Sequence, residues 1–171
     1  MDAVIVEAST PAHFDSFAEV VSEYVGWLYQ RYSDVPWLID GVGSQQALGR
    51  ELGNLAAAYS PPIGRAFLAL AGGETAGGGA YRDLHDGTCE MKRLFVREKF
   101  QGRGIGRRLC ASLVAAAKSE GYRSMRLDTG DRNSEAVTMY ESMGFRLCPP
   151  FHEYATELAS HLQFMEMPLA T

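Results

Sequence analysis

The loop Gln101-Gly102-Arg103-Gly104-Ile105-Gly106 gives the first clue to the fold. It follows a strand-like run over 88–96 and opens a helix-like run over 104–120, where apolar residues recur at helical spacing. Glycines at such a junction let the backbone approach a ligand closely, and the amino end of a helix adds the positive pole of its dipole. The loop therefore predicts a site for phosphate groups.

Two common phosphate-binding loops fit this sequence poorly. A nucleotide-binding P-loop requires a Lys-Ser or Lys-Thr pair after its last glycine, and none follows Gly106. A dinucleotide fingerprint has the spacing GxGxxG and usually follows the first strand of its unit. Here the spacing is GxGxG and three strand-like runs precede the one that leads into the loop, so the sequence disfavours both classes.

The charge of the chain is concentrated around this loop. The chain carries a net charge of −5, yet one short segment holds a single acid, Glu98, and seven basic residues: Lys92, Arg93, Arg97, Lys99, Arg103, Arg107 and Arg108. A local basic cluster on an acidic protein suits a compact polyanion better than a polymer, so we expect neither nucleic acid nor membrane as a partner. The alternative is a solvated face of ion pairs.

The periodicity of the chain predicts an α/β (α+β) fold, with a mixed, mostly antiparallel sheet flanked by helices. A Ser-Thr-Pro helix start at 9–11 and a break at 34–37 bound the first predicted helix. Gly77-Gly78-Gly79 lies inside a predicted strand and indicates a bulge or a close backbone approach, with a flexible loop as the alternative. The expected strands are 3–7, 66–70, 75–81, 88–96, 124–129, 145–148 and 164–167, and the expected helices are 11–32, 45–59, 104–120 and 133–143.

Length and cysteine content bound the organisation. With 171 residues we expect one domain over 1–171. The three cysteines, Cys89, Cys110 and Cys148, are widely spaced and odd in number, which fits a reducing, cytoplasmic environment. We expect no signal peptide, because the amino-terminal run lacks a basic region and a long apolar region. No apolar run reaches the 18 residues of a membrane span.

Two segments resemble the motifs of one enzyme family. Residues 96–106 look like motif A of the GCN5-related N-acetyltransferase (GNAT) family. Asn133-Ser134-Glu135-Ala136, followed by Tyr140 and Gly144-Phe145, resembles motif B of that family. The resemblance covers Thr88 to Phe145 and is specific through the combination of both motifs, whereas the segment before Gly64 matches only in outline.

The resemblance implies an acyl-CoA N-acyltransferase fold and acetyl-CoA as the co-substrate. In the family, strand backbone pairs with the pantetheine arm, loop amides hold the pyrophosphate, and an asparagine and a tyrosine face the thioester. Carried onto this chain, the cofactor residues are Leu94, Phe95, Val96, Gln101, Gly102, Arg103, Gly104, Ile105, Gly106, Arg107 and Asn133. The implied activity is acetyl transfer to a primary amine, with a small molecule as the preferred acceptor.

Tyr140 is the candidate acid for the departing thiolate. Acetyl transfer to an amine requires removal of a proton from the amine, stabilisation of an oxyanion and protonation of the leaving group. A phenol can donate a proton, and the predicted helix directs Tyr140 toward the motif A strand. The alternative is a core tyrosine that packs with Val137 and Met143.

Glu90 and Asp128 are the candidate bases, and we favour Glu90. Both positions match places at which branches of the family carry such a carboxylate. Burial between Cys89 and Met91 would raise the pKa of Glu90, whereas the neighbouring cations would lower it. Either carboxylate could instead pair with an arginine while a chain of water molecules removes the proton.

The remaining sequence features leave further alternatives open. We expect no metal, because His152-Glu153 lacks the partner histidine of a zinc motif. Core packing accounts for Tyr24 and Trp27 in an aromatic stretch over 24–37, and Tyr29, Tyr32 and Trp37 are candidates to wall an acceptor pocket. A non-catalytic acyl-CoA sensor, a protein N-terminal or lysine acetyltransferase, and a homodimer stay open.

Overall fold

A seven-stranded sheet organises the computed structural model, which describes residues 2–169. The strand order is β1-β2-β3-β4-β5-β7-β6, and neighbours are antiparallel except β4 and β5, which are parallel. The strands are β1 (Val4–Glu7), β2 (Gly64–Ala71), β3 (Glu74–Asp83), β4 (Thr88–Val96), β5 (Ser124–Gly130), β6 (Arg146–Leu147) and β7 (Leu162–Pro168). The expected mixed, mostly antiparallel sheet flanked by helices is confirmed.

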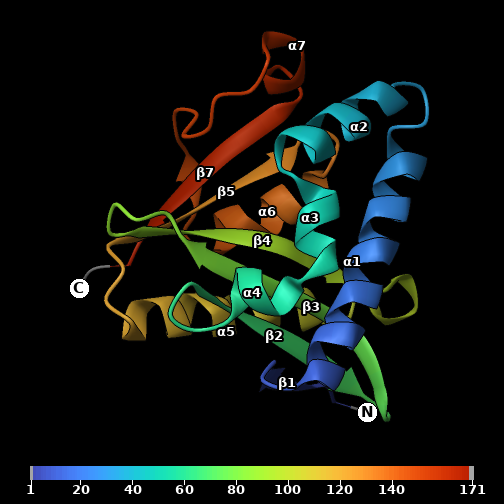
Figure 1. The fold of residues 1–171 in the computed structure, drawn as a ribbon, viewed down its shortest axis with the longest axis vertical. Helices are drawn as coiled ribbons and strands as arrows, with labels where there is room; N and C mark the ends of the chain where they lie inside the picture. The colour runs from blue at the N-terminus through green and yellow to red at the C-terminus, as the bar shows by residue number, and fades with distance from the viewer. Residues whose placement is uncertain (1, 170–171) are drawn as a thin grey trace.

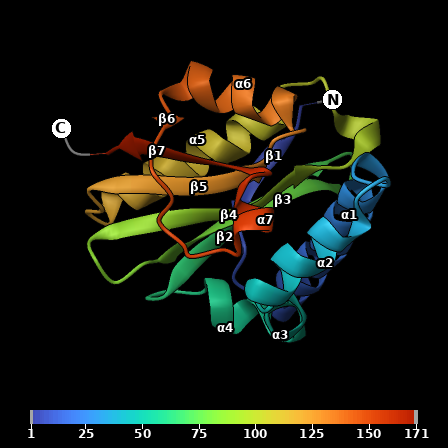
Figure 2. The ribbon, with the colours of Figure 1, turned by 90° about the horizontal axis from the view of Figure 1, so that it is seen from above.

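Helices cover both faces of the sheet (Figures 1 and 2). On one face lie α5 (Ile105–Ser119) and α6 (Ser134–Met143). The other face carries α1 (Pro11–Arg31), α2 (Pro36–Gln45), α3 (Leu48–Gly53) and α4 (Leu55–Tyr59), and a short α7 (Thr156–Ala159) precedes β7. Within residues 2–169, no helix has the length and apolar character that crossing a bilayer requires.

The segment between the first helix and β2 differs from the expectation of a single helix over 45–59. The expected break after the first helix is present, but α2 begins within it, because Pro36 occupies the first turn of α2, where its missing N–H costs nothing. Asn54 then divides the second half, since its side chain accepts a hydrogen bond from the Ala57 amide and starts α4. The result is three short helices in place of one.

The glycines of β3 lie close to the neighbouring strands, as the sequence predicted: Gly77 and Gly79 approach β4, and Gly78 approaches β2. The register between the two strands shifts between Gly78 and Ala80, so β4 carries one extra residue there. A Cβ atom added at Gly77 would lie 2.6 Å from the Phe95 carbonyl oxygen. On β4 the bulge holds Arg93 at a φ of 61°, a left-handed conformation that is uncommon for a residue with a side chain.

The parallel strands β4 and β5 separate along their length. Their pairing runs from Thr88 with Ser124 to Glu90 with Arg126. The pairing of β4 with β3 continues to Val96. The far half of β4 therefore has an edge that faces β5 across a gap, and the carboxyl ends of both strands, with the amino ends of α5 and α6, border this gap.

Alanine at Gly77 should destabilise the protein, because the new methyl group would collide with backbone atoms of β4. We expect the free energy of unfolding to fall by about 1–3 kcal/mol, as for other overpacked sites. Gly26 in α1 is the matched control, since nothing lies within 4 Å of an added Cβ. Gly26→Ala should raise the free energy by about 0.5–1 kcal/mol through helix propensity. Urea denaturation measures both, and equal effects would contradict the assigned register.

Candidate active site

A groove of about 520 Å³ opens along the gap between β4 and β5 and reaches the start of α5. We call it the β4–α5 groove. Its volume lies in the range of small-molecule and cofactor sites. It brings together every residue predicted for the cofactor except Arg103: Leu94, Phe95, Val96, Gln101, Gly102, Gly104, Ile105, Gly106, Arg107 and Asn133. Tyr24, Trp27 and Tyr140 complete part of its wall.

The glycine loop forms the end of this groove. Gly102 and Gly104 have φ values of 75° and 74°, and nothing lies within 4 Å of a Cβ built at either position. Gly104 immediately precedes the 15-residue helix α5. The loop therefore offers open space and backbone N–H groups at a helix amino end, which is the arrangement that binds phosphate.

The basic segment divides into paired and available cations. Arg93 pairs with Glu51, Arg97 pairs with Glu19 and Glu23, and Lys99 pairs with Glu74. In contrast, Arg103 and Arg107 donate to neutral oxygens, the Lys99 carbonyl at 3.1 Å and the Ser142 hydroxyl at 2.7 Å. The charges of Arg103 and Arg107 at the loop therefore remain available to an anion, whereas the cations that precede the loop form the ion pairs of the alternative interpretation.

A second, smaller hollow of about 90 Å³ lies beneath α1 and α2. We call it the inner hollow. Its lining is Tyr24, Leu28, Tyr32, Leu38, Ile39, Val42, Gln46, Met91, Lys92, Arg93, Leu94, Leu127, Asp128, Thr129, Gly130, Asn133, Tyr140 and Leu162. Five of these residues also line the β4–α5 groove: Tyr24, Leu94, Thr129, Asn133 and Tyr140. The two spaces therefore meet at a common wall.

Tyr140 stands at this junction. It is 7% exposed, and its ring packs edge-on against Phe145, with the ring centroids 5.6 Å apart. Burial raises the pKa of Tyr140 well above its ordinary value, and the nearby Cys110 and Tyr24 raise it further. The phenol therefore keeps its proton at working pH. The ring of Tyr140 belongs to the hydrophobic core, and the residue also borders the β4–α5 groove and the inner hollow.

Asn133 caps the entry to α6 and is 3% exposed. Its amide nitrogen donates to the Thr129 hydroxyl at 3.2 Å. Its side-chain oxygen is buried and has no hydrogen-bond partner among residues 2–169. A buried acceptor without a partner is costly, so the atom is suited to an N–H group of a bound molecule.

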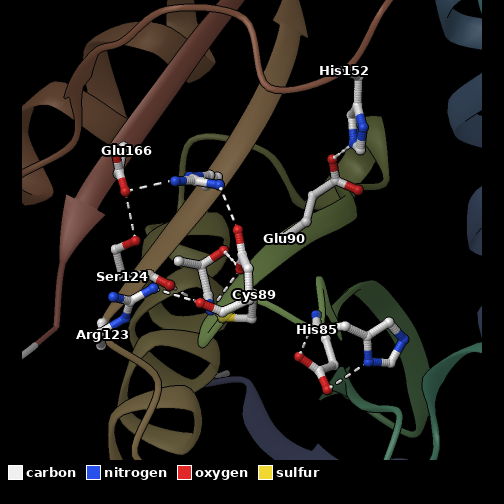
Figure 3. A network of polar contacts seen from close by, with 11 residues as sticks. His85, Cys89, Glu90, Arg123, Ser124, His152 and Glu166 are labelled. Carbon is white, nitrogen blue, oxygen red and sulfur yellow. Dashed lines mark hydrogen bonds and ion pairs between the residues drawn. The ribbon is translucent and has the colours of Figure 1, made fainter.

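Glu90 is fully buried and lines neither space. Its carboxylate contacts the His152 ring (Figure 3). Arg82 lies 2.9 Å from one carboxylate oxygen and Lys92 lies 3.7 Å from it, while His152 contacts the other oxygen. Burial alone raises the pKa of Glu90, but His152, Lys92 and Arg82 together lower it to about 2. The expected burial is present, but the opposing effect prevails, because the hydrogen bond with His152 and the charge of Arg82, which sequence proximity did not indicate, add to the charge of Lys92.

Asp128 differs from Glu90 in exposure and in the direction in which its pKa is shifted. It lines the inner hollow on β5, beyond the point at which β4 and β5 part. Burial raises the pKa of Asp128 above its ordinary value, against the opposing charge of Lys92, and Glu90 raises it further. A carboxylate with a raised pKa that borders a cavity has the properties required of a general base.

A chain of hydrogen bonds connects Asp128 to Arg93 across the inner hollow. The Tyr154 hydroxyl donates to Asp128 at 3.0 Å, and Gln46 donates to that hydroxyl at 2.8 Å. Arg93 in turn donates to the Gln46 side-chain oxygen at 2.8 Å and to Glu51 at 2.7 Å. Sequence reasoning missed Tyr154, Gln46 and Glu51, because each lies far from the motifs and carries no spacing signal.

Three candidate ligand atoms, from Glu90, Asp128 and His152, lie within 4.8 Å of one another. A cluster of this kind has the composition of a metal site. Arg82 and Lys92 already neutralise the Glu90 carboxylate, however, and their charges oppose the binding of a further cation. The cluster is better described as a buried ion-pair network.

The aromatic stretch contributes to the site in a different way from the expectation. Tyr24 stacks on Phe95 and borders both spaces, and Tyr32 lines the inner hollow. Tyr29 bonds to Asp40 at the surface, and Trp37 is 45% exposed. Of the three proposed wall residues, only Tyr32 therefore borders the inner hollow.

The sheet order and the paired spaces define the class of acyl-CoA N-acyltransferases. The chain matches the model of the acetyltransferase (GNAT) family over residues 23–145 and belongs to this family. An uncharacterized N-acetyltransferase of Schizosaccharomyces pombe is 33% identical over 83% of this chain and 82% of its own length. The protein is therefore an acyltransferase of this family, as the sequence motifs predicted.

Other relatives agree with this assignment. A protein named IAA acetyltransferase, from Azospirillum brasilense, is 34% identical over 61% of this chain and 68% of its own. Among solved structures, a GNAT acetyltransferase from Staphylococcus aureus has a TM-score of 0.73 at 18% identity and covers 98% of this chain and 99% of that one. PaiA N-acetyltransferase from Thermoplasma acidophilum, in complex with coenzyme A, has a TM-score of 0.71 at 19% identity with the same coverage.

Replacing Glu90 by Gln should remove a pH-dependent part of the stability. The pKa of Glu90 is about 2 in the folded protein, below its ordinary value of 4.5. Its ionised form therefore stabilises the fold above pH 4.5, and this contribution is lost as the pH falls toward 2. Urea denaturation across this range should show the free energy of unfolding falling more steeply in the unmodified protein than in Glu90→Gln.

Glu135 provides the matched control for this prediction. Its pKa is also lowered to about 2, first by the hydrogen bond from Arg31, but its side chain is 65% exposed. Solvent screens such a pair, so Glu135→Gln should leave the pH profile nearly unchanged. Parallel profiles for Glu90→Gln and the unmodified protein would show that the Glu90 network does not stabilise the fold.

Proposed function

We propose that this protein transfers the acetyl group of acetyl-CoA to the primary amine of a small acceptor. The single observation that carries the proposal is the common wall at which the β4–α5 groove and the inner hollow meet. Acetyl-CoA occupies the groove, and the amine approaches from the hollow. Because both reactants meet at Tyr140 and Asn133, the enzyme turns a bimolecular encounter into an oriented one.

The groove supports a role for each part of the cofactor. The unpaired edge of Leu94, Phe95 and Val96 accepts the amide groups of the pantetheine arm as a further strand would. The amides from Gly102 to Arg107 hold the pyrophosphate at the helix amino end, and Gln101 supports the loop by donating to the Val96 carbonyl at 2.9 Å. The free oxygen of Asn133 accepts an N–H near the thioester.

The chemistry divides between Asp128 and Tyr140. Asp128 takes the proton from the ammonium group, directly or through a water molecule, so that the neutral amine attacks the thioester carbonyl. The tetrahedral intermediate then collapses, the carbon–sulfur bond breaks, and Tyr140 gives its proton to the departing thiolate, while the extra proton on the attacking nitrogen leaves through water and restores the Tyr140 phenol. The base favoured from sequence was Glu90, but Asp128 borders the hollow and Glu90 does not, so Glu90 acts by holding Lys92 and His152.

The proposed compartment is the cytoplasm. Cys89, Cys110 and Cys148 are all free thiols, and burial raises the pKa of each one. Protonated thiols that are inert and unpaired are suited to a reducing environment.

Glutamate at Gly104 should abolish acetyl-CoA binding while the protein stays folded. The new side chain would occupy the open space of the loop, and its charge would repel the pyrophosphate. Gly121, at the other end of α5, is the matched control because it also has a positive φ, of 87°, and open space around an added Cβ. Thermal shift with acetyl-CoA should report stabilisation of Gly121→Glu and none of Gly104→Glu. Equal binding by both variants would refute the groove assignment.

Phenylalanine at Tyr140 should lower kcat and leave the KM for acetyl-CoA near normal. The substitution keeps the ring against Phe145 but removes the proton donor, and general acid steps are typically worth about 10²–10⁴-fold. Tyr122→Phe is the control, since Tyr122 packs on Tyr81 and lines neither space. Thiol release measures both rates. A kcat within about twofold of the unmodified protein would assign Tyr140 to packing alone.

Asparagine at Asp128 should lower kcat/KM by about 10²-fold or more at pH values below the pKa of the acceptor amine. The defect should shrink as the pH rises, because the acceptor then loses its proton without help. A pH profile of thiol release for Asp128→Asn, with Glu90→Gln in parallel, measures the difference. A larger loss in Glu90→Gln would transfer the role of base to Glu90, and a loss that is independent of pH would assign Asp128 to acceptor positioning.

A further inference from the structure

We infer that the acceptor amine also carries a carboxylate and that Arg93 binds it, which makes a small amino acid the substrate class. This inference rests on the proposed acetyl transfer and adds the identity of the second substrate. The observations that carry it are an unpaired nitrogen on a nearly buried guanidinium, a backbone bulge at the same residue, and the size and walls of the inner hollow.

Two of the three nitrogens of the Arg93 guanidinium have hydrogen-bond partners, and the third has none within residues 2–169. Its Nε donates to Glu51 at 2.7 Å and its Nη1 donates to Gln46 at 2.8 Å. The Nη2 atom is buried and has no hydrogen-bond partner among residues 2–169, although Arg93 lines the inner hollow. A rigid donor fork of this kind matches the oxygens of a carboxylate.

The bulge in β4 gives Arg93 access to the hollow. Consecutive residues of a regular strand point to opposite faces, yet Lys92 and Arg93 both line the inner hollow. The φ of 61° at Arg93 changes the direction of the chain there. A non-glycine residue persists in this conformation only when the surroundings impose it, and such positions cluster at ligand sites. Ion pairing with Glu51 alone would not require the bulge.

The charges of the hollow fit a molecule with two opposite groups. Asp128 is the anion of the lining and receives the ammonium group, while Lys92 and Arg93 are its cations. Tyr154 donates to Asp128, and Gln46 connects Tyr154 to Arg93, so two side chains stand between the anion and this cation. An acceptor with an ammonium group for Asp128 and a carboxylate for Arg93 matches this order.

The dimensions of the hollow select a small acceptor. At roughly 10–15 Å³ for each water molecule, a volume of about 90 Å³ holds about six to nine waters. That is about the number of non-hydrogen atoms in an amino acid. Leu28, Leu38, Ile39 and Val42 supply apolar walls, which suit an aliphatic body between or beside the charged groups.

Three matched acceptors, assayed with the unmodified protein, test whether the enzyme recognises a carboxylate on its acceptor. Leucine, leucinamide and isopentylamine share one body and differ in bearing a carboxylate, a neutral amide or neither. Thiol release at saturating acetyl-CoA gives kcat/KM, which is measured for each acceptor across a pH range and compared per concentration of the ammonium form that Asp128 receives. Leucine should exceed the other two by about tenfold or more, a margin of about 1.4 kcal/mol, chiefly through KM. Glycine, β-alanine and γ-aminobutyrate then report the spacing that fits between Asp128 and Arg93.

The variant Arg93→Lys tests whether Arg93 binds the carboxylate of the acceptor. Lysine keeps the charge beside Glu51 but loses the fork, so the KM for leucine should rise about tenfold while the values for isopentylamine and acetyl-CoA stay unchanged. Arg65→Lys is the control, because Arg65 pairs with Glu7 and Glu120 and lines neither space. If Arg93→Lys does not fold, the comparison of acceptors on the unmodified protein still decides the matter.

Several results would overturn the inference. Equal or faster acetylation of leucinamide or isopentylamine would show that no carboxylate is recognised, and preference for a peptide amino terminus would point to a protein acceptor. An unchanged KM for leucine in folded Arg93→Lys would remove Arg93 from recognition. These outcomes leave acetyl transfer intact, whereas the absence of a thermal shift with acetyl-CoA would overturn the proposed function itself and this inference with it.

Discussion

The separation of β4 from β5 after Glu90 is the constraint on which the rest of the site depends. Two parallel strands that stay paired would bury their edges against each other and leave no room for a ligand. Here β4 follows β3 to Val96, while β5 turns toward β7. The gap exposes the edge of β4, forms the groove that ends at the α5 loop, and leaves Asp128 at the border of the inner hollow.

Two carboxylates near the point where β4 and β5 separate, Glu90 and Asp128, have different surroundings. Glu90 is fully buried and paired with Arg82, Lys92 and His152, which lower its pKa and favour its ionised form. Asp128 lies close to the same cluster but borders the cavity, where burial raises its pKa. Two carboxylates on neighbouring strands thus acquire different roles from their surroundings, which is a general way to assign acid and base functions.

The glycine loop and the strand before it were predictable, because their signals are local. Gly102 and Gly104 adopt the positive φ values for which glycine is suited, and the residues predicted for the cofactor lie around one groove, apart from Arg103. The environment of Glu90 was not predictable, because His152 reaches it from 62 positions away in the chain. The three short helices after α1 were also missed, since Pro36 can either end a helix or begin one.

Amide hydrogen exchange at the free edge of β4 tests the separation of the strands most directly. NMR spectra of the protein with and without acetyl-CoA would follow the amide protons of Leu94 to Val96 that face away from β3. The account predicts rapid exchange in the free protein and slower exchange with acetyl-CoA, while the core amides of Leu113 and Met125 stay protected throughout. Slow exchange of the edge amides in the free protein, or no change under conditions where thermal shift reports binding, would contradict it.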